Sequence, residues 1–260
     1  MRYRLSPALV AGLCVLGFGA ARAEAQAPIN GEFNILWFNP DPDITLQSGS
    51  LTGATGITNI DFVDVFGIEK KGFPEIRFFA GRSHKFRFGY IPIKYEAATT
   101  INRTITFQGR TFTVGVPATT EIKENILKVG YEWDFVSREK GFFGVVGELK
   151  YVTLDASITS TALASPAATE QNAPVPTIGV AGRGYPHPMV SISGEFTGLK
   201  VNSSDFEASL WDWDVNGAVT FGKYIGVQGG YRSFTIDFTI DDDIGNIKVM
   251  GPYVGAVVRF

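Results

Sequence analysis

Apolar side chains recur at every second position along most of this 260-residue chain. In the stretch "LWDWDV", Trp211 and Trp213 fall on one face of an extended backbone, while Asp212 and Asp214 fall on the other. A period of two residues is the signature of β-strands with two chemically different faces. Beyond the N-terminal leader, no uncharged apolar run approaches the ~20 residues of a membrane-spanning helix. The pattern therefore predicts an all-β protein.

The alternating pattern divides the chain into ten candidate strands. Their predicted bounds are 31–39, 73–81, 84–95, 118–136, 142–158, 175–185, 189–201, 206–221, 224–240 and 246–260. Tight turns alternate with connections that are longer on average, and both chain ends fall on the side of the tight turns. This layout is typical of outer-membrane barrels, which have short periplasmic turns and longer extracellular loops. We therefore predict a transmembrane up-and-down antiparallel β-barrel of about ten strands, with eight or twelve as alternatives.

Two of the longer connections carry structure of their own. Residues 56–68 fit either an additional strand or an amphipathic loop segment. Residues 101–116 read as a hairpin that turns at Gln108-Gly109. The segment 165–176, "SPAATEQNAPVP", is the most loop-like stretch of the chain.

The predicted strand 224–240 changes phase. Ile225 and Val227 fall on one face, whereas Phe234 and Ile236 fall on the other, so we predict a β-bulge near Arg232-Ser233. Pro252 lacks an N–H for a ladder hydrogen bond, and it predicts a bulge or local break in the last strand.

The N-terminal segment has the features of a secretory signal peptide: basic residues, the apolar run 8–20 and small residues at 21–27. We expect residues 1–25 to be removed and residues 26–260 to form one barrel domain. Removal leaves 20 basic and 25 acidic residues (23 − 3 and 26 − 1), a net charge of −5 that gives no support to nucleic-acid binding. Cys14 leaves with the signal, so the mature chain has no disulfide or thiolate chemistry.

The faces opposite the apolar ones combine glycine with charges of both signs. In a soluble barrel the apolar face points inward, and in a membrane barrel it points outward. Glycine beside compensating charges suits a cramped polar lumen better than a solvated surface, and aromatic residues near strand ends suit membrane interfaces. The predicted lumen charge network comprises Arg77, Arg87, Lys128, Glu132, Asp134, Glu148, Lys150, Arg183, Glu195, Asp212, Asp214 and Arg259.

The C-terminal stretch "YVGAVVRF" carries a more specific motif. Tyr253, Gly255, Val258 and Phe260 match the spacing of the barrel-assembly signal in the last strand of Gram-negative outer-membrane proteins. On this motif, the signal peptide and the strand pattern, the sequence resembles a small outer-membrane barrel of the OmpA/OmpW type. The resemblance implies the cell outer membrane as location, with membrane lipid and the barrel-assembly machinery as partners. We expect the last strand to close against residues 31–38.

Catalytic and metal-binding patterns are weak in this chain. The two histidines, His84 and His187, fall in predicted turns. Asp212 and Asp214 resemble half of the omptin protease site, but no Asp-x-His completes it, and His187 and Ser191 have the wrong spacing for a lipid A deacylase pair. The acidic run 241–243 lacks the ligand spacing of an EF-hand. We predict no cofactor, no metal site and no catalytic residue.

These observations favour a non-enzymatic outer-membrane barrel that is structural or passes a small solute through a narrow pore. One alternative is a barrel enzyme, omptin- or lipid-hydrolase-like, with acidic residues at the extracellular rim. The other is a soluble, exported, ligand-binding β-barrel. The sequence leaves the solute and the oligomeric state open.

Overall fold

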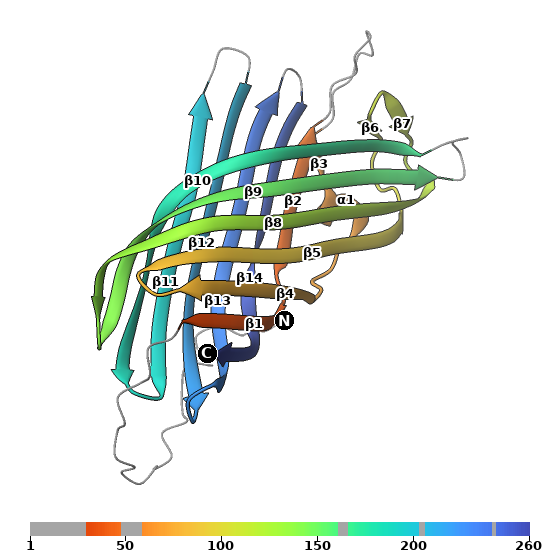
Figure 1. Cartoon of the computed structure of the whole chain (residues 1–260). Coiled ribbons are helices and arrows are strands. Elements are labelled where there is room, and N and C mark those ends of the chain that lie inside the picture. The colour runs from red at the N-terminus through yellow and green to blue at the C-terminus, as the bar shows by residue number, and fades with distance from the viewer. Residues whose placement is uncertain (1–29, 48–58, 161–165, 203–205, 241–242) are drawn as a thin grey trace, which may run out of the picture.

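The computed structural model describes residues 30–47, 59–160, 166–202, 206–240 and 243–260. Within these residues the chain forms a closed antiparallel barrel of ten strands, seen from the side in Figure 1. The predicted signal segment 1–25 lies outside the described residues. The barrel strands, in their order around the wall, are β1 (Gly31–Phe38), β4 (Phe73–Gly81), β5 (His84–Thr100), β8 (Pro117–Arg138), β9 (Gly141–Ser160), β10 (Ala167–His187), β11 (Val190–Asn202), β12 (Phe206–Phe221), β13 (Ile225–Ile240) and β14 (Asp243–Arg259).

The barrel closes between β1 and β14. Their antiparallel register runs from Glu32 opposite Arg259 to Phe38 opposite Tyr253. This pairing removes the free edge that an open sheet would present, and hydrocarbon tolerates no unpaired backbone groups. The ten predicted strands correspond one to one with these ten, so the predicted fold class and the predicted closure are both confirmed.

Five further elements decorate the loop side of the barrel. They are β2 (Asp41–Gln47), β3 (Asn59–Asp61), α1 (Phe62–Phe66), β6 (Ile105–Phe107) and β7 (Arg110–Phe112). β2 lies beyond β1 along the same edge of β14 and pairs with its residues Ile244 to Met250. β3 in turn pairs with β2. β6 and β7 form the predicted hairpin, turning at Gln108 (φ 50°) and Gly109 (φ 69°).

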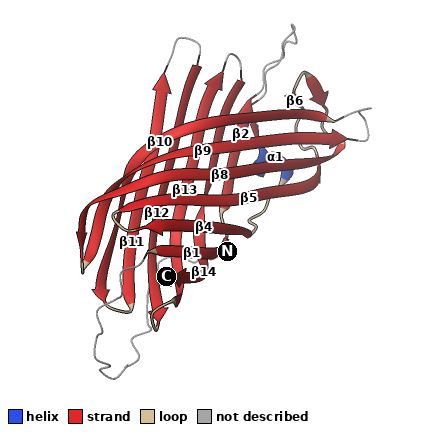
Figure 2. Cartoon of the chain, viewed as in Figure 1, coloured by secondary structure: helices blue, strands red, loops and turns tan. Residues whose placement is uncertain are grey.

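The short helix α1 occupies part of the segment 56–68, which therefore contains both a strand and an amphipathic helix. The Asp61 side chain caps it by accepting hydrogen bonds from the backbone N–H groups of Val63 and Asp64. The helix ends at Gly67, whose φ of 69° is the left-handed conformation that glycine adopts without strain. Figure 2 shows this blue helix behind the front strands. Among the described residues, no helix has the length and apolar character needed to cross a membrane.

The outer surface of the barrel carries its apolar side chains. Ile178, Val215 and Val254 are 71%, 53% and 61% exposed, and Trp37, Trp133 and Phe221 lie beside the same surface. The interior holds the charges: Lys150 is 0% exposed and Arg232 is 1% exposed. This distribution is the inverse of that in a soluble β-barrel, so the soluble alternative is wrong.

The interior changes character along the barrel axis. Towards the loop side, inward-facing positions become apolar and form one buried core with α1 and the β6–β7 hairpin. Residues of this core from the barrel wall include Ile91, Ile93, Ile122, Ile126, Val152, Leu154, Leu210, Phe234, Ile247 and Val249, and those from the insertions include Ile60, Phe62, Phe66, Phe107 and Phe112. The lumen therefore has a charged half and an apolar half.

The predicted β-bulge at Arg232-Ser233 is absent from the described strand. β13 pairs with both β12 and β14 in one unbroken register from Ile225 to Ile240. Phe234 faces inward, as Arg232 does, because it lies where the lumen has become apolar. The apparent phase change in the sequence is therefore a change of environment along one face.

The prediction of a loop at 165–176 is also wrong, because β10 begins at Ala167 and includes most of this segment. Residues 167–177 pair with β9, whereas the pairing of β10 with β11 begins only at Ile178. Pro174 and Pro176 lie in this part of β10, next to its open edge, where a strand tolerates residues without an N–H.

The predicted break at Pro252 is confirmed on one side of β14. Pairing with β13 continues through Pro252. On the other side, β14 pairs with β2 up to Met250 and with β1 from Tyr253, and the Asn39 N–H donates to the Pro252 carbonyl oxygen at 2.9 Å.

Replacing Val215 with Arg tests the assignment of the outer surface. Val215 is 53% exposed in the middle of an apolar surface, so Val215→Arg should lower the free energy of unfolding by about 2–4 kcal/mol. Val114, 61% exposed on the loop side, offers a matched control, and Val114→Arg should change stability by less than about 0.5 kcal/mol. Urea titration in phospholipid vesicles measures both. Equal tolerance of the two substitutions would contradict the assignment.

Candidate functional site

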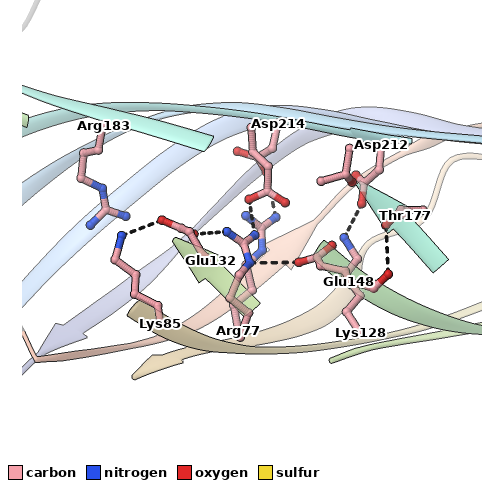
Figure 3. A network of polar contacts seen from close by, with 12 residues as sticks. Arg77, Lys85, Lys128, Glu132, Glu148, Thr177, Arg183, Asp212 and Asp214 are labelled. Atoms are coloured by element: carbon pink, nitrogen blue, oxygen red, sulfur yellow. Dashed lines mark hydrogen bonds and ion pairs between the residues drawn. The ribbon is translucent and has the colours of Figure 1, made fainter. Parts of the chain in front are cut away.

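The charged half of the lumen is spanned by a set of ion pairs that we call the charge layer (Figure 3). It consists of Glu75, Arg77, Arg87, Lys128, Glu132, Glu148, Lys150, Glu195, Asp212, Asp214 and Arg232. These side chains come from seven strands and meet across the barrel, because alternate residues of each strand point inward.

Arg232 on β13 joins two walls of the barrel. Its Nη1 donates to Glu75 Oε1 on β4 at 2.8 Å, and its Nη2 donates to Asp212 Oδ2 on β12 at 2.9 Å. Its side chain is 1% exposed. A guanidinium so fully removed from water is tolerated because planar N–H groups satisfy both carboxylates at once.

Arg77 makes a second link across the lumen. It pairs with Glu75 on its own strand at 2.6 Å and with Asp214 on β12 at 2.9 Å. Asp214 Oδ1 also accepts hydrogen bonds from the Tyr253 hydroxyl at 2.7 Å and from Asn216 at 2.8 Å. One ion pair and two hydrogen bonds therefore hold the Asp214 carboxylate.

Arg87 on β5 contacts three carboxylates. It pairs with Glu148 at 3.0 Å and makes further ion pairs with Glu132 and Glu195. Glu195 belongs to β11, on the far side of the lumen from β5 in the strand order. The guanidinium thus holds the wall formed by β5, β8 and β9 against β11.

Two lysines complete the layer around Asp212. Lys128 donates to Asp212, and Lys150 lies 3.4 Å from the same carboxylate and 3.1 Å from Glu148. Lys150 also donates to the hydroxyl oxygens of Thr177 and Thr197. With Arg232 included, Asp212 faces three cations, and its negative charge is fully compensated.

A separate cluster lies nearer the tight turns. Arg183 on β10 donates to Glu32 on β1 at 2.6 Å, and Arg259 on β14 donates to the same carboxylate at 2.9 Å. Arg259 also donates to Thr220 and Ser191. Because β10 and β1 stand on opposite walls, Glu32 ties the two sides of the barrel together at this end.

The structure places all twelve residues of the predicted lumen network inside the barrel. Nine of them belong to the charge layer, and Asp134 lies beside it, joined to Glu132 through Lys85. The other two, Arg183 and Arg259, lie together around Glu32. The predicted network lacks four residues that the structure adds to these clusters: Glu32, Glu75, Lys85 and Arg232. Arg232 was missed because a bulge was expected at its position; the unbroken alternation of Gln228, Gly230 and Arg232 was the signal that could have found it.

The residues of the C-terminal motif divide between the two faces of β14. Tyr253 is 4% exposed inside the barrel, whereas Val258 and Phe260 are 39% and 54% exposed outside. Their recognition by barrel-assembly machinery stays a prediction.

A cavity of about 410 Å³ lies between the charge layer and the tight turns, and we call it the vestibule. Its lining includes Arg82, Ser83 and Arg138 at the turns and Arg77, Arg87 and Asp214 at its inner end. A second cavity, of about 30 Å³, lies within the charge layer itself. The lumen is thus hollow on the tight-turn side.

The histidines lie away from these charges. His84 stacks on Trp133, with ring planes 2° apart, and its Nδ1 is hydrogen-bonded to the Tyr131 hydroxyl on the outer surface. His187 accepts a hydrogen bond from the Met189 N–H within its turn. Within the described ranges, no three His, Cys, Asp or Glu side chains are grouped to hold a metal ion, and Asp241 and Asp242 lie outside those ranges.

Glu124 is an exception in the apolar core beyond the membrane-facing part of β8. It is 2% exposed, and its Oε1 has no hydrogen-bond partner. Burial raises the pKa of Glu124 to about 7, which the positive charge of Arg232 offsets only in part. Burial and the nearby carboxylates Glu124 and Asp41 raise the pKa of Tyr95, whose hydroxyl also has no partner.

The apolar exterior, the charged interior and the closed meander with tight turns at one end together define an integral outer-membrane β-barrel. The chain resides in the outer membrane, with its apolar surface against lipid.

No protein-family model and no curated protein sequence matches the chain. Among solved structures, the outer membrane protease OmpT from Escherichia coli is similar at 10% identity and a TM-score of 0.45, covering 92% of this chain and 99% of OmpT. The attachment invasion locus protein Ail of Yersinia pestis, in complex with a heparin analogue, is similar at 10% identity and a TM-score of 0.39, covering 89% and 100%. The outer membrane protein AlkL is similar at 12% identity and a TM-score of 0.38, covering 94% and 97%. At such identities and TM-scores, these likenesses carry no argument about activity or ligand.

Removing Arg232 should destabilise the barrel strongly. Arg232→Met keeps most of the side-chain volume but leaves Glu75 and Asp212 without a shared cation, which should cost about 3–5 kcal/mol. The matched control is Lys200→Met, because Lys200 forms a 3.0 Å pair with Glu207 in which both side chains are at least half exposed. That change should cost less than about 1 kcal/mol. Urea unfolding in vesicles measures both, and similar losses would contradict a structural role for the charge layer.

Glu124 should make stability depend on pH. Because its folded pKa of about 7 exceeds the ordinary value of 4.5, the folded state retains the proton more strongly than the unfolded state. Its contribution is therefore most favourable below pH 4.5 and is lost as pH rises towards 7. Glu124→Gln should remove this part of the pH dependence.

The measurement is urea unfolding of the wild type and Glu124→Gln from mildly acidic to mildly alkaline pH. The difference between the two curves isolates Glu124 from every other titrating group. Parallel curves would show that Glu124 does not titrate in this window.

Proposed function

We propose that this protein is a non-enzymatic, structural outer-membrane barrel whose lumen is closed to bulk diffusion. The observation that carries the proposal is the double closure of the interior. Ion pairs between opposite walls cross the charged half, with Arg232 and Lys150 removed from solvent. The apolar core, packed around α1 and the β6–β7 hairpin, fills the other half.

The size of the remaining space supports a closed lumen. The cavity within the charge layer is about 30 Å³, and a buried water needs roughly 10–15 Å³ of such space. A hydrated ion or a sugar does not fit through it without rearrangement of the ion pairs. Narrow passage of a small solute is therefore the less favoured form of the proposal.

The proposed absence of enzymatic activity rests on the two aspartates of the omptin-like alternative. Asp212 is 3% exposed and is compensated by three cations, and Asp214 is compensated by Arg77 and further held by Tyr253. A general base needs access to a substrate or a water and a free lone pair in position. Both carboxylates lie in mid-barrel, so they do not fit the role of an extracellular acidic site.

Planar-bilayer recordings test the proposal. The refolded wild type should insert without producing stepwise, ohmic current at either polarity. Heat-dependent migration in gel electrophoresis verifies that the inserted protein is folded. Repeated current steps of uniform size would contradict the closed lumen.

Liposome swelling separates the structural role from narrow solute passage. Vesicles that contain the protein should swell no faster than empty vesicles in isosmotic arabinose or glycine. Faster swelling with either solute, in the absence of current steps, would replace the structural role with the narrow-pore alternative.

A further inference from the structure

The outer surface at the tight-turn end carries a continuous series of ring contacts across β5, β8 and β9, which we call the aromatic cluster. The His84 ring stacks on Tyr131 and on Trp133, with ring centroids 5.9 Å and 6.3 Å apart. Trp133 meets Phe135, and Phe135 meets Phe143, in edge-to-face contacts of 6.3 Å and 5.4 Å. The Tyr, Trp and Phe rings are between 44% and 52% exposed, as is typical of side chains at a membrane interface.

A β-bulge in β8 enlarges this cluster. The register of β8 against β9 shifts by one residue between Trp133 and Val136, so that Asp134 and Phe135 together oppose Gly144. As a result Phe135 and Val136, although adjacent in the sequence, are both exposed on the outer surface, at 50% and 41%. Regular alternation would have turned one of them into the lumen. The bulge therefore adds apolar surface at this rim.

Cations flank the aromatic cluster in two turns. Arg82 lies in the turn between β4 and β5, and Arg138 and Lys140 flank Glu139 where β8 turns into β9. All three cations are exposed, and none of them forms an ion pair with a carboxylate of the described residues. Arg82 donates to Asn30 Oδ1 at 2.6 Å, which leaves its charge uncompensated. The two turns therefore carry a net charge of +2, from three cations and one acid.

Exposed lysines near the loops are arranged differently. Lys94 pairs with Glu96 and Glu121 at 2.6 Å and 2.8 Å, and Lys200 pairs with Glu207 at 3.0 Å. These two lysines are 43% and 57% exposed, so an exposed position does not by itself leave a cation without a carboxylate. The excess positive charge beside the aromatic cluster is available to an anion from outside the chain.

We propose that the aromatic cluster and its flanking cations form a binding site for an anionic phospholipid of the leaflet at the tight-turn end. The apolar surface of the barrel lies in lipid, so phospholipid headgroups of this leaflet lie at the level of the turns. The basic side chains bind the anionic headgroup, and the rings contact the glycerol backbone and the first methylene groups. A zwitterionic phospholipid offers the same phosphate, but its own ammonium cancels the charge that the turns attract.

Trp133 provides a reporter within the proposed site. All four tryptophans lie in the described residues, and Trp37, Trp211 and Trp213 lie nearer the loops. Replacing those three with Phe leaves Trp133 alone, and bromine on lipid acyl chains quenches a tryptophan that the lipid contacts. The variant is placed in phosphatidylcholine vesicles that contain either brominated phosphatidylglycerol or brominated phosphatidylcholine at the same mole fraction.

The anionic lipid should associate with the Trp133 site about fivefold more tightly than the zwitterionic one, which is the ratio that one basic side chain near the lipid surface contributes. Raising the salt concentration should reduce this ratio. Equal quenching by the two lipids at low salt would overturn the proposal.

Charge variants locate the site. Arg138→Gln combined with Lys140→Gln should bring the binding ratio close to one, and Arg82→Gln should lower it in part. The matched control is Lys223→Gln, which removes a cation from the turn between β12 and β13, four strands away around the barrel, and should leave the ratio unchanged. An unchanged ratio in the double variant, or an equal loss in Lys223→Gln, would show that the preference does not arise at this site and would overturn the proposal.

A free phosphate is the competing occupant, because Arg82 and Arg138 also line the vestibule. Glycerol 3-phosphate should reduce the quenching no more than sodium chloride of equal ionic strength does. A larger reduction would assign these cations to a soluble phosphate and would overturn the lipid site.

Native mass spectrometry decides the matter if the variant with one tryptophan does not refold. From an equimolar mixture of the two lipids, the wild type should retain more phosphatidylglycerol than phosphatidylcholine, and the Arg138→Gln and Lys140→Gln double variant should retain both equally. Heat-dependent gel migration verifies folding in each case. Equal retention of the two lipids by the wild type would overturn the proposal.

Discussion

The whole structure depends on the pairing of β1 with β14. A sheet in hydrocarbon must leave no backbone N–H or C=O unpaired, so ten strands have to form a ring, and the first must meet the last. The register from Glu32–Arg259 to Phe38–Tyr253 achieves this closure. It also sets where each inward side chain lies, since a shift by one residue would exchange the lipid face and the lumen face.

Closure of a barrel this narrow creates a second problem, which is how to fill its interior. The chain uses two solutions stacked along the axis. In the half nearer the tight turns, charges of both signs neutralise one another, and each buried ion is tolerated because a partner from another wall satisfies it. Towards the loops, β2, β3, α1 and the β6–β7 hairpin supply apolar side chains that pack as in a soluble core. Tyr95 and Glu124 keep unpartnered polar atoms inside that apolar half.

The strand number, the closure and the outward direction of the apolar face could all be predicted from the sequence. The period of two carries that information, because lipid demands an uninterrupted apolar face on every strand. The change of environment inside the barrel could not be predicted. Arg232 and Phe234 fall on the same strand face, and a charged residue followed by an apolar one looks like a change of phase if each face is assumed to meet a single environment. The start of β10 was hidden for a related reason: Pro174 and Pro176 argue against a strand unless its edge is known to be open.

The candidate site shows the same limit. The sequence of one strand predicts which face a side chain occupies, but its contacts depend on how the strands are arranged in the closed barrel. Alternation places Arg87 and Glu195 on inward faces, but their contact depends on the strand order and stagger that bring β5 opposite β11. Once the partners are known, the inner cations Arg77, Arg87 and Arg183 are seen to be engaged in ion pairs with carboxylates of other strands. Which inner charges are neutralised therefore depends on the pairing scheme across the lumen. A count of charges along the chain would describe the interior as nearly neutral, and it would miss which charges meet across the lumen.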